Sequence, residues 1–449
     1  MGIFTAPWRL SAPVCTLFDI GAASARAGGR AKSIAASAIA TSCSASIAAA
    51  SCGIILSPAG NFFPCCRLFH LPKPSNVPAD RPLQKMSKSE PALSPEKPVP
   101  ALPMALGRPG MAFEQTSCPL CGAERFDLYC EAPDRLQPKT GLLYKIQRCR
   151  HCGMIYLNPR PAEKESGQFY EHADYLPFTS LAANRSLTAR LYGVLRRANL
   201  RWKRRVINDF WQRTKDSERE TNNHLPPEGR SFAPCPLLDV GCGTGEFLVE
   251  MKNAGWQVEG LERDERVAAW AREQHQIPVA AGHVEQLAAS TQQYHIITLW
   301  HVLEHLYDPG RALAILAERL RDEGWLLIAV PNIAGLDARV YKSNWVALDA
   351  PRHLNHFSLE TLSRLGSKHG LTLRWWRQLP LDAFFNALMS EKLAAERNRR
   401  KWYLWPLRML RAFGVACASY LGGSHTPFSY ASYGASLVCF FEKSKSKRS

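Results

Sequence analysis

The sequence predicts an α/β fold in the C-terminal half of the chain, with a mostly parallel sheet that carries helices on both faces. From Pro236 onward, short apolar runs alternate with amphipathic helical segments. This rhythm is typical of parallel sheets, because each crossover between strands places a helix on the sheet. One strand-to-helix turn contains three alternate glycines, and two C-x2-C pairs lie upstream. The pairs indicate a separate small metal-binding domain ahead of the sheet.

The expected elements follow one another in regular order. The strands are Leu237–Val240, Gln257–Leu261, Pro278–Ala281, His295–Leu299, Trp325–Val330, Leu371–Trp375 and Ala435–Phe441. The helices are Glu246–Ala254, Arg263–His275, Leu313–Leu320 and Leu359–His369, the last with Ser358 placed to cap it. We therefore expect one doubly wound sheet.

Residues 1–112 differ in composition from the rest of the chain. They are rich in Ala, Ser and Pro, contain few acids and show no sustained period of 2 or 3.6 residues. Such a segment cannot bury enough apolar surface to offset its ordering entropy, so it predicts a disordered or low-complexity leader. A translation start at Met86 or Met111, or a targeting peptide, are alternatives. The uncharged stretch from Ser33 to Cys66 is mostly Ala and Ser, which argues against a membrane span.

The 449 residues suffice for two or three domains. After the leader we expect a zinc-binding ribbon at 113–180, a basic helix and linker at 181–230, and the α/β domain at 231–449 with an insertion at 380–430. The formal net charge of +17 indicates an anionic partner, either nucleic acid or an acidic membrane surface.

Four cysteines predict a metal site. Cys118 and Cys121 form one C-x2-C pair, Cys149 and Cys152 form the other, and a glycine follows each pair. Four thiolates suit tetrahedral zinc and leave no open position, so we expect a structural role. The 27 residues between the pairs exceed the spacing of about 15–20 that is usual for such sites, so one knuckle should carry an extra hairpin.

Cysteine usage also bears on the compartment. The chain has 14 cysteines, and the paired arrangement fits metal binding in a reducing compartment better than a disulfide framework. Cys130 and His151 are alternative ligands in less regular positions. We therefore expect a cytoplasmic protein, with or without association with a membrane.

The glycine-rich loop after the first strand predicts a binding site for a nucleoside-like ligand. Asp239 ends the strand, and Gly241, Gly243 and Gly245 alternate in the turn that leads into the helix. Glycines allow positive φ and close approach of a ligand, and the helix N-terminus offers unpaired N–H groups. The spacing G-x-G-x-G differs from the dinucleotide spacing G-x-G-x-x-G. Glu262 ends the next strand, where an acid can accept hydrogen bonds from ribose hydroxyls.

These residues resemble motif I and the acidic residue after it in class I S-adenosylmethionine-dependent methyltransferases. His295–Pro309 is similar to the fourth strand and following loop of that family, residues 330–332 to the end of the fifth strand, and residues 344–357 to a segment of bacterial members that act on small molecules. A zinc ribbon before such a domain is a recurrent bacterial arrangement. The resemblance covers residues 231–442 and implies a Rossmann-like, seven-stranded, doubly wound sheet whose last strand, here Ala435–Phe441, is antiparallel.

The resemblance implies S-adenosylmethionine as the cofactor. By it, Asp239, Gly241 and Gly243 contact the amino-acid part of the cofactor and Glu262 holds the ribose. His283 stands where the family often has an acid near the adenine, which leaves the adenine contact open. The expected cofactor-binding residues are Asp239, Gly241, Gly243, Gly245, Glu262, His283 and Trp300.

Four histidines lie in the two loops expected over the cofactor. Methyl transfer from a sulfonium is a direct displacement that requires alignment, and a hydroxyl acceptor also requires a base. Histidine has a suitable unperturbed pKa, and we expect His305, then His353, to be that catalytic base. Alternatively, His301 is a satisfied core residue, His305 helps to cap a helix, and His353 and His356 fix the loop through backbone hydrogen bonds.

Other residues of the same loops have less definite roles. Asp349 and Arg352 are weaker candidates for holding the substrate. Trp300 and Trp345 either wall the pocket or pack in the core.

The sequence also bears on the acceptor. Leu299–Val302 lacks the Asn/Asp-Pro-Pro-Tyr/Phe tetrad of methyltransferases that modify exocyclic amines of nucleic-acid bases, so we expect a small molecule: a sugar, a quinone-like ring or a lipid-linked intermediate. Residues 397–422 set basic residues beside Trp and Tyr, which suits a helix on an acidic membrane or a lid over the pocket. The alternatives are RNA modification through ribbon and basic helix, and a silent scaffold, against which the intact loop argues.

Overall fold

The computed structural model describes residues 111–137, 140–170, 187–221, 235–397, 402–422 and 434–444. These segments all belong to one compact unit that spans Pro98–Ser449. The predicted leader lies outside the described residues except for Met111 and Ala112, and so does most of the predicted linker before residue 231.

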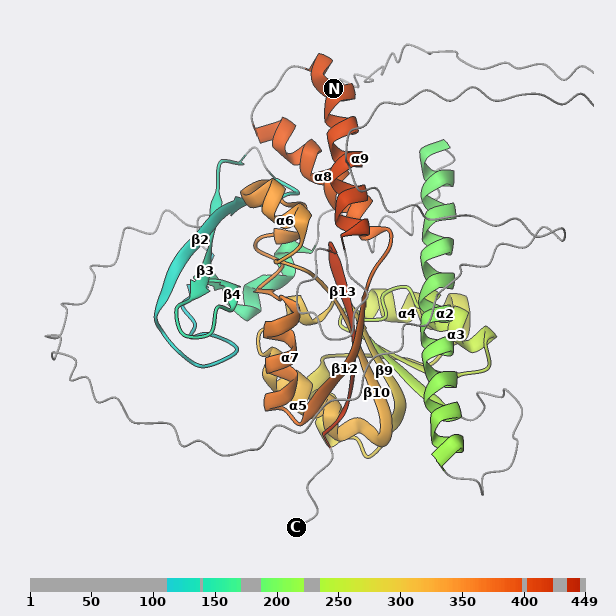
Figure 1. Cartoon of the computed structure of the whole chain (residues 1–449). Coiled ribbons are helices and arrows are strands. Elements are labelled where there is room, and N and C mark those ends of the chain that lie inside the picture. The colour runs from blue at the N-terminus through green and yellow to red at the C-terminus, as the bar shows by residue number, and fades with distance from the viewer. Residues whose placement is uncertain are drawn as a thin grey trace, which may run out of the picture. The chain divides into compact units, whose positions relative to one another are not determined.

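A seven-stranded sheet forms the centre of the fold (Figure 1). Its strands, in the spatial order β12-β13-β10-β9-β6-β7-β8, are Leu371–Gln378, Ser436–Lys443, Leu320–Pro331, Tyr294–Trp300, Pro236–Val240, Gln257–Glu262 and Val279–Ala281. The five strands from β10 to β8 run parallel, and β13 is antiparallel to both of its neighbours. This topology confirms the predicted Rossmann-like sheet with its antiparallel last strand.

The order of strands also locates a ligand site. From β6 the chain adds β7 and β8 on one side and then β9 and β10 on the other. A sheet of this kind opens a crevice at the carboxyl ends of the strands where the order reverses. The loops after β6 and β9, residues 241–245 and 301–308, border that crevice.

Helices cover both faces of the sheet because neighbouring strand residues point to opposite sides. Leu237 faces the side packed by α2 (Leu187–Thr221), α3 (Glu246–Asn253) and α4 (Glu265–His275). Leu238 faces the other side, which is packed by α5 (Pro309–Arg319), α7 (Leu359–Lys368) and the short η3 (Val284–Ala289). Two apolar cores result, one on each face.

Helix boundaries differ from the predictions mainly at the starts of α5 and α4, while α3 and α7 each end one residue earlier than predicted, at Asn253 and Lys368. The helix predicted at Leu313–Leu320 is α5, which begins at Pro309 because Asp308 caps it, its side chain accepting from the backbone N–H of Arg311. It ends one residue earlier, since Leu320 is already the first residue of β10. Helix α4 begins at Glu265, after the cap Asp264, and not at Arg263.

The basic helix α2 is part of the core of the fold. Val206, Ile207 and Trp211 are buried against the sheet. On the side toward α3, Arg196 pairs with Glu246 at 2.6 Å. The interpretation of α2 as a solvated basic helix therefore holds for only part of the helix surface.

A second, four-stranded sheet holds the cysteine knuckles. Its order is β11-β4-β3-β2, with β11 at Asn355–His356, β4 at Ile155–Leu157, β3 at Leu143–Cys149 and β2 at Phe126–Pro133. The β2–β3 hairpin is the extra hairpin expected between the two C-x2-C pairs. Strand β11 comes from the α/β region of the chain. The sequence around the cysteine pairs therefore does not reveal this fourth strand of the small sheet.

Short elements complete this part. Strands β1 (Phe113–Glu114) and β5 (Arg160–Pro161) pair with each other, and η2 (Glu163–Phe169) follows. In the second loop region, α6 (Leu336–Tyr341) leads into the turns η5 (Lys342–Asn344) and η6 (Val346–Leu348). The turn η4 (Leu303–His305) follows β9.

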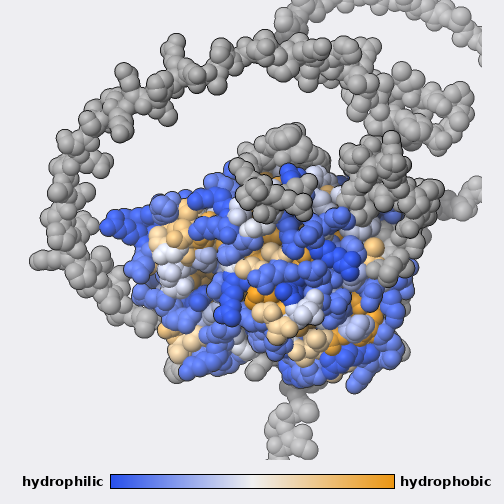
Figure 2. Space-filling model, turned by 90° about the horizontal axis from the view of Figure 1, so that it is seen from below, coloured by the Kyte–Doolittle hydropathy of each residue, from blue (hydrophilic) through white to orange (hydrophobic). Residues whose placement is uncertain are grey.

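The segment between β12 and β13 forms a helical hairpin. Helix α8 (Asp382–Arg397) packs against α9 (Trp405–Leu421), with the turn η7 (Trp402–Leu404) before α9, and both contact α6 (Figure 1). Among the residues described, no helix combines the length and the apolar character needed to cross a membrane. The opposite end of the molecule, seen from below, carries mainly hydrophilic residues with separated apolar patches (Figure 2).

Candidate cofactor and acceptor site

The glycine loop has the backbone that its sequence predicts. Gly241, Gly243 and Gly245 have φ of 70°, 54° and 75°, which side chains other than glycine rarely adopt. A Cβ at Gly241 would lie 2.5 Å from Val302, and one at Gly245 would lie 2.6 Å from Ile277. A Cβ at Gly243 would have no neighbour within 4 Å. Gly241 and Gly245 are therefore needed for packing as well as conformation, whereas Gly243 borders open space that a ligand can enter.

Two acidic residues flank this loop. Thr298 donates a hydrogen bond of 2.6 Å to Asp239, which is 3% exposed at the end of β6. Burial raises the pKa of Asp239 to about 7, although the hydrogen bond from Thr298 and the charge of Lys203 act in the opposite direction. Glu262 accepts from the backbone N–H of Gly243 at 2.8 Å, which holds its carboxylate beside the loop.

Lys203 of α2 reaches the same place and was not predicted. Its ammonium lies 4.2 Å from the ring centroid of Trp300, which ends β9 and packs edge-on against Phe247. Burial lowers the pKa of Lys203 to about 8, against the attraction of Asp239 and Asp382. The role of Trp300 as a wall of the pocket stays a prediction. The available signal was the heptad spacing of Arg196 and Lys203, which puts both on one face of α2.

His283 is exposed and occupies the N-cap position of η3, two residues after the end of β8. Its contact with the adenine stays a prediction.

His301 follows Trp300 and links two parts of the site. Its backbone has a positive φ of 58°, its Nδ1 lies 3.2 Å from Glu304, and its Nε2 lies 3.1 Å from Asp382 of α8. Burial alone would lower the pKa of His301, but the two carboxylates raise it to about 10. His301 is therefore a satisfied residue, as one interpretation of the sequence had it, although a third of its side chain is exposed.

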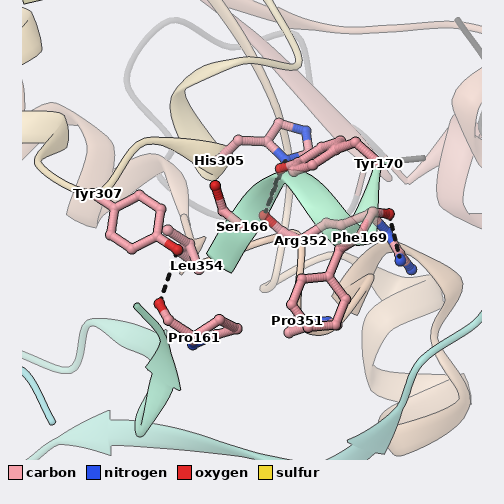
Figure 3. A pocket seen from close by; sticks show the side chains of 9 residues that line it. All are labelled: Pro161, Ser166, Phe169, Tyr170, His305, Tyr307, Pro351, Arg352 and Leu354. Carbon is pink, nitrogen blue, oxygen red and sulfur yellow. Dashed lines mark hydrogen bonds between the residues drawn. The ribbon is translucent and has the colours of Figure 1, made fainter. Parts of the chain in front are cut away.

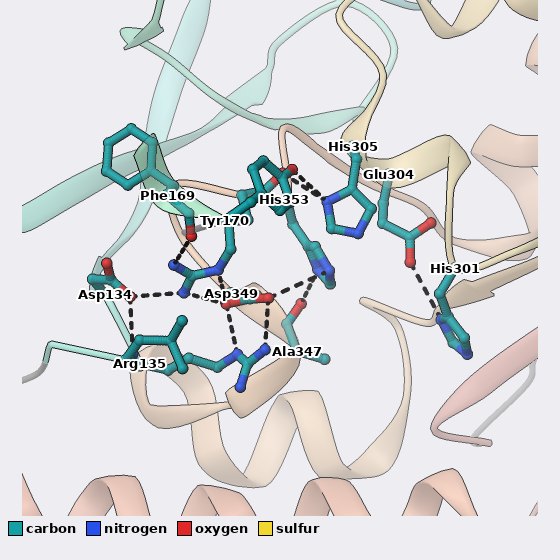
Figure 4. A network of polar contacts seen from close by, with 12 residues as sticks. Asp134, Arg135, Phe169, Tyr170, His301, Glu304, His305, Ala347, Asp349 and His353 are labelled. Atoms are coloured by element: carbon teal, nitrogen blue, oxygen red, sulfur yellow. Dashed lines mark hydrogen bonds and ion pairs between the residues drawn. The ribbon is translucent and has the colours of Figure 1, made fainter. Parts of the chain in front are cut away.

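The two histidines expected to act as a base lie together. The ring centroids of His305 and His353 are 4.6 Å apart. Nδ1 of His305 lies 3.0 Å from the carbonyl oxygen of Arg352, and Nδ1 of His353 lies 2.8 Å from that of Ala347 (Figure 4). Burial lowers the pKa of His305 to about 4 and also lowers that of His353, so both imidazoles are neutral at pH 7.

The neighbouring His356 lies in β11 and is buried. Its Nε2 has no hydrogen-bonding partner among the described residues. Burial lowers its pKa to about 3, with His353 adding to the effect. The expected backbone hydrogen bonds therefore account for His353 and leave His356 unexplained.

Asp349 and Arg352 belong to a buried ion-pair network with the ribbon. Arg352 pairs with Asp349 and also with Asp134, at 2.7 Å, while Arg135 pairs with Asp349 at 2.6 Å (Figure 4). These contacts give both side chains a structural role. Trp345 is likewise a core residue, 1% exposed, and its indole donates to Asp337.

A cavity lies on the ribbon side of His305 (Figure 3). Its volume is about 10 Å³, room for about one water molecule, and it lies between His305 and Tyr307 on one side and Phe169 and Tyr170 on the other. None of its lining residues belongs to the glycine loop. The space beside His305 is thus distinct from the space above Gly243.

The four knuckle cysteines converge. Sγ of Cys118 lies 3.4 Å from that of Cys152, and Sγ of Cys121 lies 3.6 Å from that of Cys149. Zinc–sulfur bonds of about 2.3 Å in a tetrahedron place sulfur atoms about 3.8 Å apart, so the cluster fits zinc. In each knuckle the glycine N–H donates to the carbonyl of the first cysteine, which wraps the backbone around the site.

The sheet order, the glycine loop and its two acids define the class: the chain carries a class I S-adenosylmethionine-dependent methyltransferase domain. In particular, residues 196–374 match a family model described as "Methyltransferase domain". The matched residues begin within α2 and run to β12.

Curated relatives point the same way. A "Ubiquinone biosynthesis O-methyltransferase" of Bordetella pertussis is 32% identical over 102 residues, which cover 21% of this chain and 42% of the relative. A protein of the same name from Aeromonas salmonicida is 26% identical over 153 residues, which cover 31% of this chain and 63% of the relative. The chain thus spans less than half the length of the first relative and less than two thirds of the second.

Solved structures show limited similarity to the whole chain. An S-adenosylmethionine-dependent methyltransferase from Mesorhizobium loti has a TM-score of 0.31 at 15% identity and covers 49% of this chain and 94% of its own. A cyclopropane synthase from Mycobacterium tuberculosis has a TM-score of 0.32 at 16% identity, with coverage of 47% and 78%.

The open space at Gly243 makes a direct prediction. Gly243→Arg should fill that space and abolish binding of S-adenosylhomocysteine, and Asp239→Ala should do the same by removing the buried acid. Both variants should keep the zinc content of the wild-type chain, since the knuckles are distant in sequence and in a different sheet. Calorimetric titration and metal analysis measure the two properties. Normal cofactor binding by either variant would contradict the assignment of the loop.

The raised pKa of Asp239 predicts pH-dependent binding of S-adenosylmethionine. Below about pH 7 the carboxyl is mostly protonated, and above it the carboxylate is available to the cationic cofactor. Affinity should therefore rise between pH 6 and about 7.5. Equilibrium dialysis of wild type and Asp239→Asn measures this, and the variant should bind weakly without the rise. A wild-type affinity independent of pH would count against ionisation of Asp239 in binding.

Proposed function

We propose that this protein transfers a methyl group from S-adenosylmethionine to a small-molecule acceptor. The observation that carries the proposal is the open space at Gly243, bordered by Asp239 and Glu262 at the switch point of the sheet. Carboxylates suit a ligand with hydroxyl groups and positive charge, and glycine with positive φ allows its close approach.

Each residue of the loop would have a definite task. Glu262, held by the N–H of Gly243, would accept from the ribose hydroxyls. Asp239 would face the amino-acid part, and Trp300 would wall the sulfonium end. Because the loop after β9 leaves the same edge of the sheet, the methyl group would be directed toward residues 301–308.

We further propose that the acceptor approaches from the cavity beside His305. Tyr170, Tyr307 and Phe169 line that cavity, and aromatic side chains suit contact with a planar ring, for which the cavity would have to widen. The curated relatives are named as O-methyltransferases of ubiquinone biosynthesis, which supports an oxygen acceptor on a quinone-like ring. His305 or His353 would then accept the proton of the acceptor hydroxyl, since both imidazoles are neutral and lie close together.

We propose zinc as a structural ion at Cys118, Cys121, Cys149 and Cys152. Four converging thiol groups in two glycine-ended knuckles match the ligand set and geometry of such sites. The ion would fix the end of the small sheet. It would take no part in methyl transfer, because four protein ligands leave no position for substrate.

The RNA alternative has less support. It would need free basic side chains on α2 to contact phosphates. Arg196 and Arg204 pair with Glu246 and Glu250 of α3, which leaves the exposed Arg197, Arg201 and Arg205 as the side chains that could do so.

The decisive experiment is calorimetric titration of S-adenosylmethionine and S-adenosylhomocysteine into the purified chain, with zinc measured on the same sample. We expect micromolar binding and one zinc per chain, as a single four-cysteine site requires. A folded, zinc-loaded chain that binds neither ligand would overturn the proposed activity and favour a silent scaffold.

We also propose that the α8–α9 hairpin contacts a membrane surface, where a lipid-linked acceptor would be found. Ten large apolar side chains of the hairpin and its connecting turn are exposed: Phe384, Phe385, Leu388, Tyr403, Trp405, Leu407, Leu410, Phe413, Tyr420 and Leu421. Arg408 and Arg411 both pair with Glu391, so the hairpin presents mainly apolar and aromatic groups. Trp and Tyr among aliphatic residues are typical of membrane interfaces.

Vesicle flotation tests this contact. The wild-type chain should float with vesicles of phosphatidylcholine and phosphatidylglycerol, and the triple variant Leu407→Ser, Leu410→Ser, Phe413→Ser should not, because it loses apolar area at the surface. Leu128→Ser, at an exposed position of β2, is the matched control and should float like wild type. Equal flotation of the triple variant and wild type would rule out the hairpin as the contact.

A further inference from the structure

A second group of potential metal ligands lies at the end of β9. Glu304, His305 and His353 each offer one ligand atom, and these atoms all lie within 4.8 Å of one another. Figure 4 shows the three side chains beside one another, between His301 and the ion-pair network of Asp349. The group is separate from the four-cysteine cluster, with which it shares no residue.

The carboxylate of Glu304 is buried and only half used. The residue is 1% exposed, and its Oε1 lies 3.2 Å from Nδ1 of His301. Its Oε2 is buried and has no hydrogen-bonding partner among the described residues. A buried carboxylate oxygen without a partner is costly, so the site has a position for a cation or a donor.

Each of the two imidazoles is held by a backbone contact of its Nδ1. In both His305 and His353, Nδ1 lies within 3.0 Å of a backbone carbonyl oxygen, which a protonated Nδ1 would satisfy, and the Tyr170 hydroxyl lies 3.1 Å from Nδ1 of His305. Nε2 of each ring then has a free lone pair. Metal-bound histidines commonly donate Nδ1–H to a carbonyl in this way, which fixes the ring and its tautomer.

Other charged groups face the cluster. Asp349 lies 3.8 Å from Nε2 of His353, but it is already paired with Arg135 and Arg352. His301 is held by Glu304 on one side and Asp382 on the other. Each of these charged groups has an oppositely charged partner. The Oε2 atom of Glu304 is the one among the atoms named here that has none.

We propose that Glu304, His305 and His353 bind a divalent first-row transition-metal ion. Two imidazoles and one carboxylate form a ligand set that suits zinc, manganese, iron or cobalt. Three protein ligands leave at least one coordination position open. The ion would lie next to the cavity that His305 lines.

The role of this ion rests on the proposed function. An acceptor hydroxyl bound at the open position would lose its proton more easily, because a divalent cation lowers the pKa of an oxygen that it binds. His305 and His353 would then act on the acceptor through the metal and not as a base. The binding of the ion itself does not depend on that role.

The test uses the full chain with zinc already in the four-cysteine site. Manganese is titrated in and free Mn²⁺ is followed by electron paramagnetic resonance, since Mn²⁺ prefers oxygen and nitrogen ligands and does not compete for thiolates. We expect one further Mn²⁺ per chain. Co²⁺ is the second probe, and its absorption at this site should lack the sulfur-to-metal charge-transfer bands of a thiolate site.

Variants assign the ion to the cluster. Glu304→Gln and His353→Gln should each weaken binding of the added ion at least about tenfold, as the loss of a ligand requires. Glu285→Gln, an exposed acid on η3, is the matched control and should bind the ion like wild type. Binding of S-adenosylhomocysteine should be unchanged in all three, which shows that the domain is folded and tests the proposed function separately.

Three results would overturn the proposal: neither Mn²⁺ nor Co²⁺ binds to the zinc-loaded chain, the bound ion shows sulfur charge transfer, or Glu304→Gln and His353→Gln bind it as tightly as wild type. Each of these can occur while the cofactor still binds. Failure of the metal site is therefore distinguishable from failure of the methyltransferase assignment.

Discussion

The buried pairing of Asp349 and Arg352 with Asp134 and Arg135 is the interaction on which the site depends. It joins two segments more than 200 positions apart, and each guanidinium meets a carboxylate at hydrogen-bonding distance. A buried ion pair is often no better than apolar packing, but removal of one partner costs about 3–5 kcal/mol because a charge is left unpaired. The network therefore holds the ribbon in one position against the loop that carries His353.

Other contacts also hold the small sheet and its neighbouring segments against the α/β region. Strand β11, with His356, pairs with β4 of the small sheet. Tyr170 of the ribbon side lies 3.1 Å from Nδ1 of His305. Neither contact involves the glycine loop, so the proposed cofactor pocket belongs to the large sheet and the proposed acceptor side to the contact between the two sheets.

The large sheet could be predicted because each strand and helix leaves a local pattern. Apolar runs predicted the strands, and Gly241, Gly243 and Asp239 predicted the glycine-rich loop after β6. The start of α5 was missed although Asp308 and Pro309 carry a helix-start signal. The contact of Lys203 with Trp300 and the Asp134–Arg352 pair could not be predicted, since a contact between distant segments has no periodicity within either one. The buried state of the histidines likewise follows from tertiary packing, which residue type alone does not report.

The pairing of β11 with β4 has a consequence for how such proteins can diversify. A ribbon that borrowed nothing from its neighbour could be exchanged between homologues as an independent module. Here the small sheet includes Asn355 and His356, two residues after His353. A recombination event that replaced the ribbon would also have to replace the loop on the proposed acceptor side, so the two segments are expected to be inherited together.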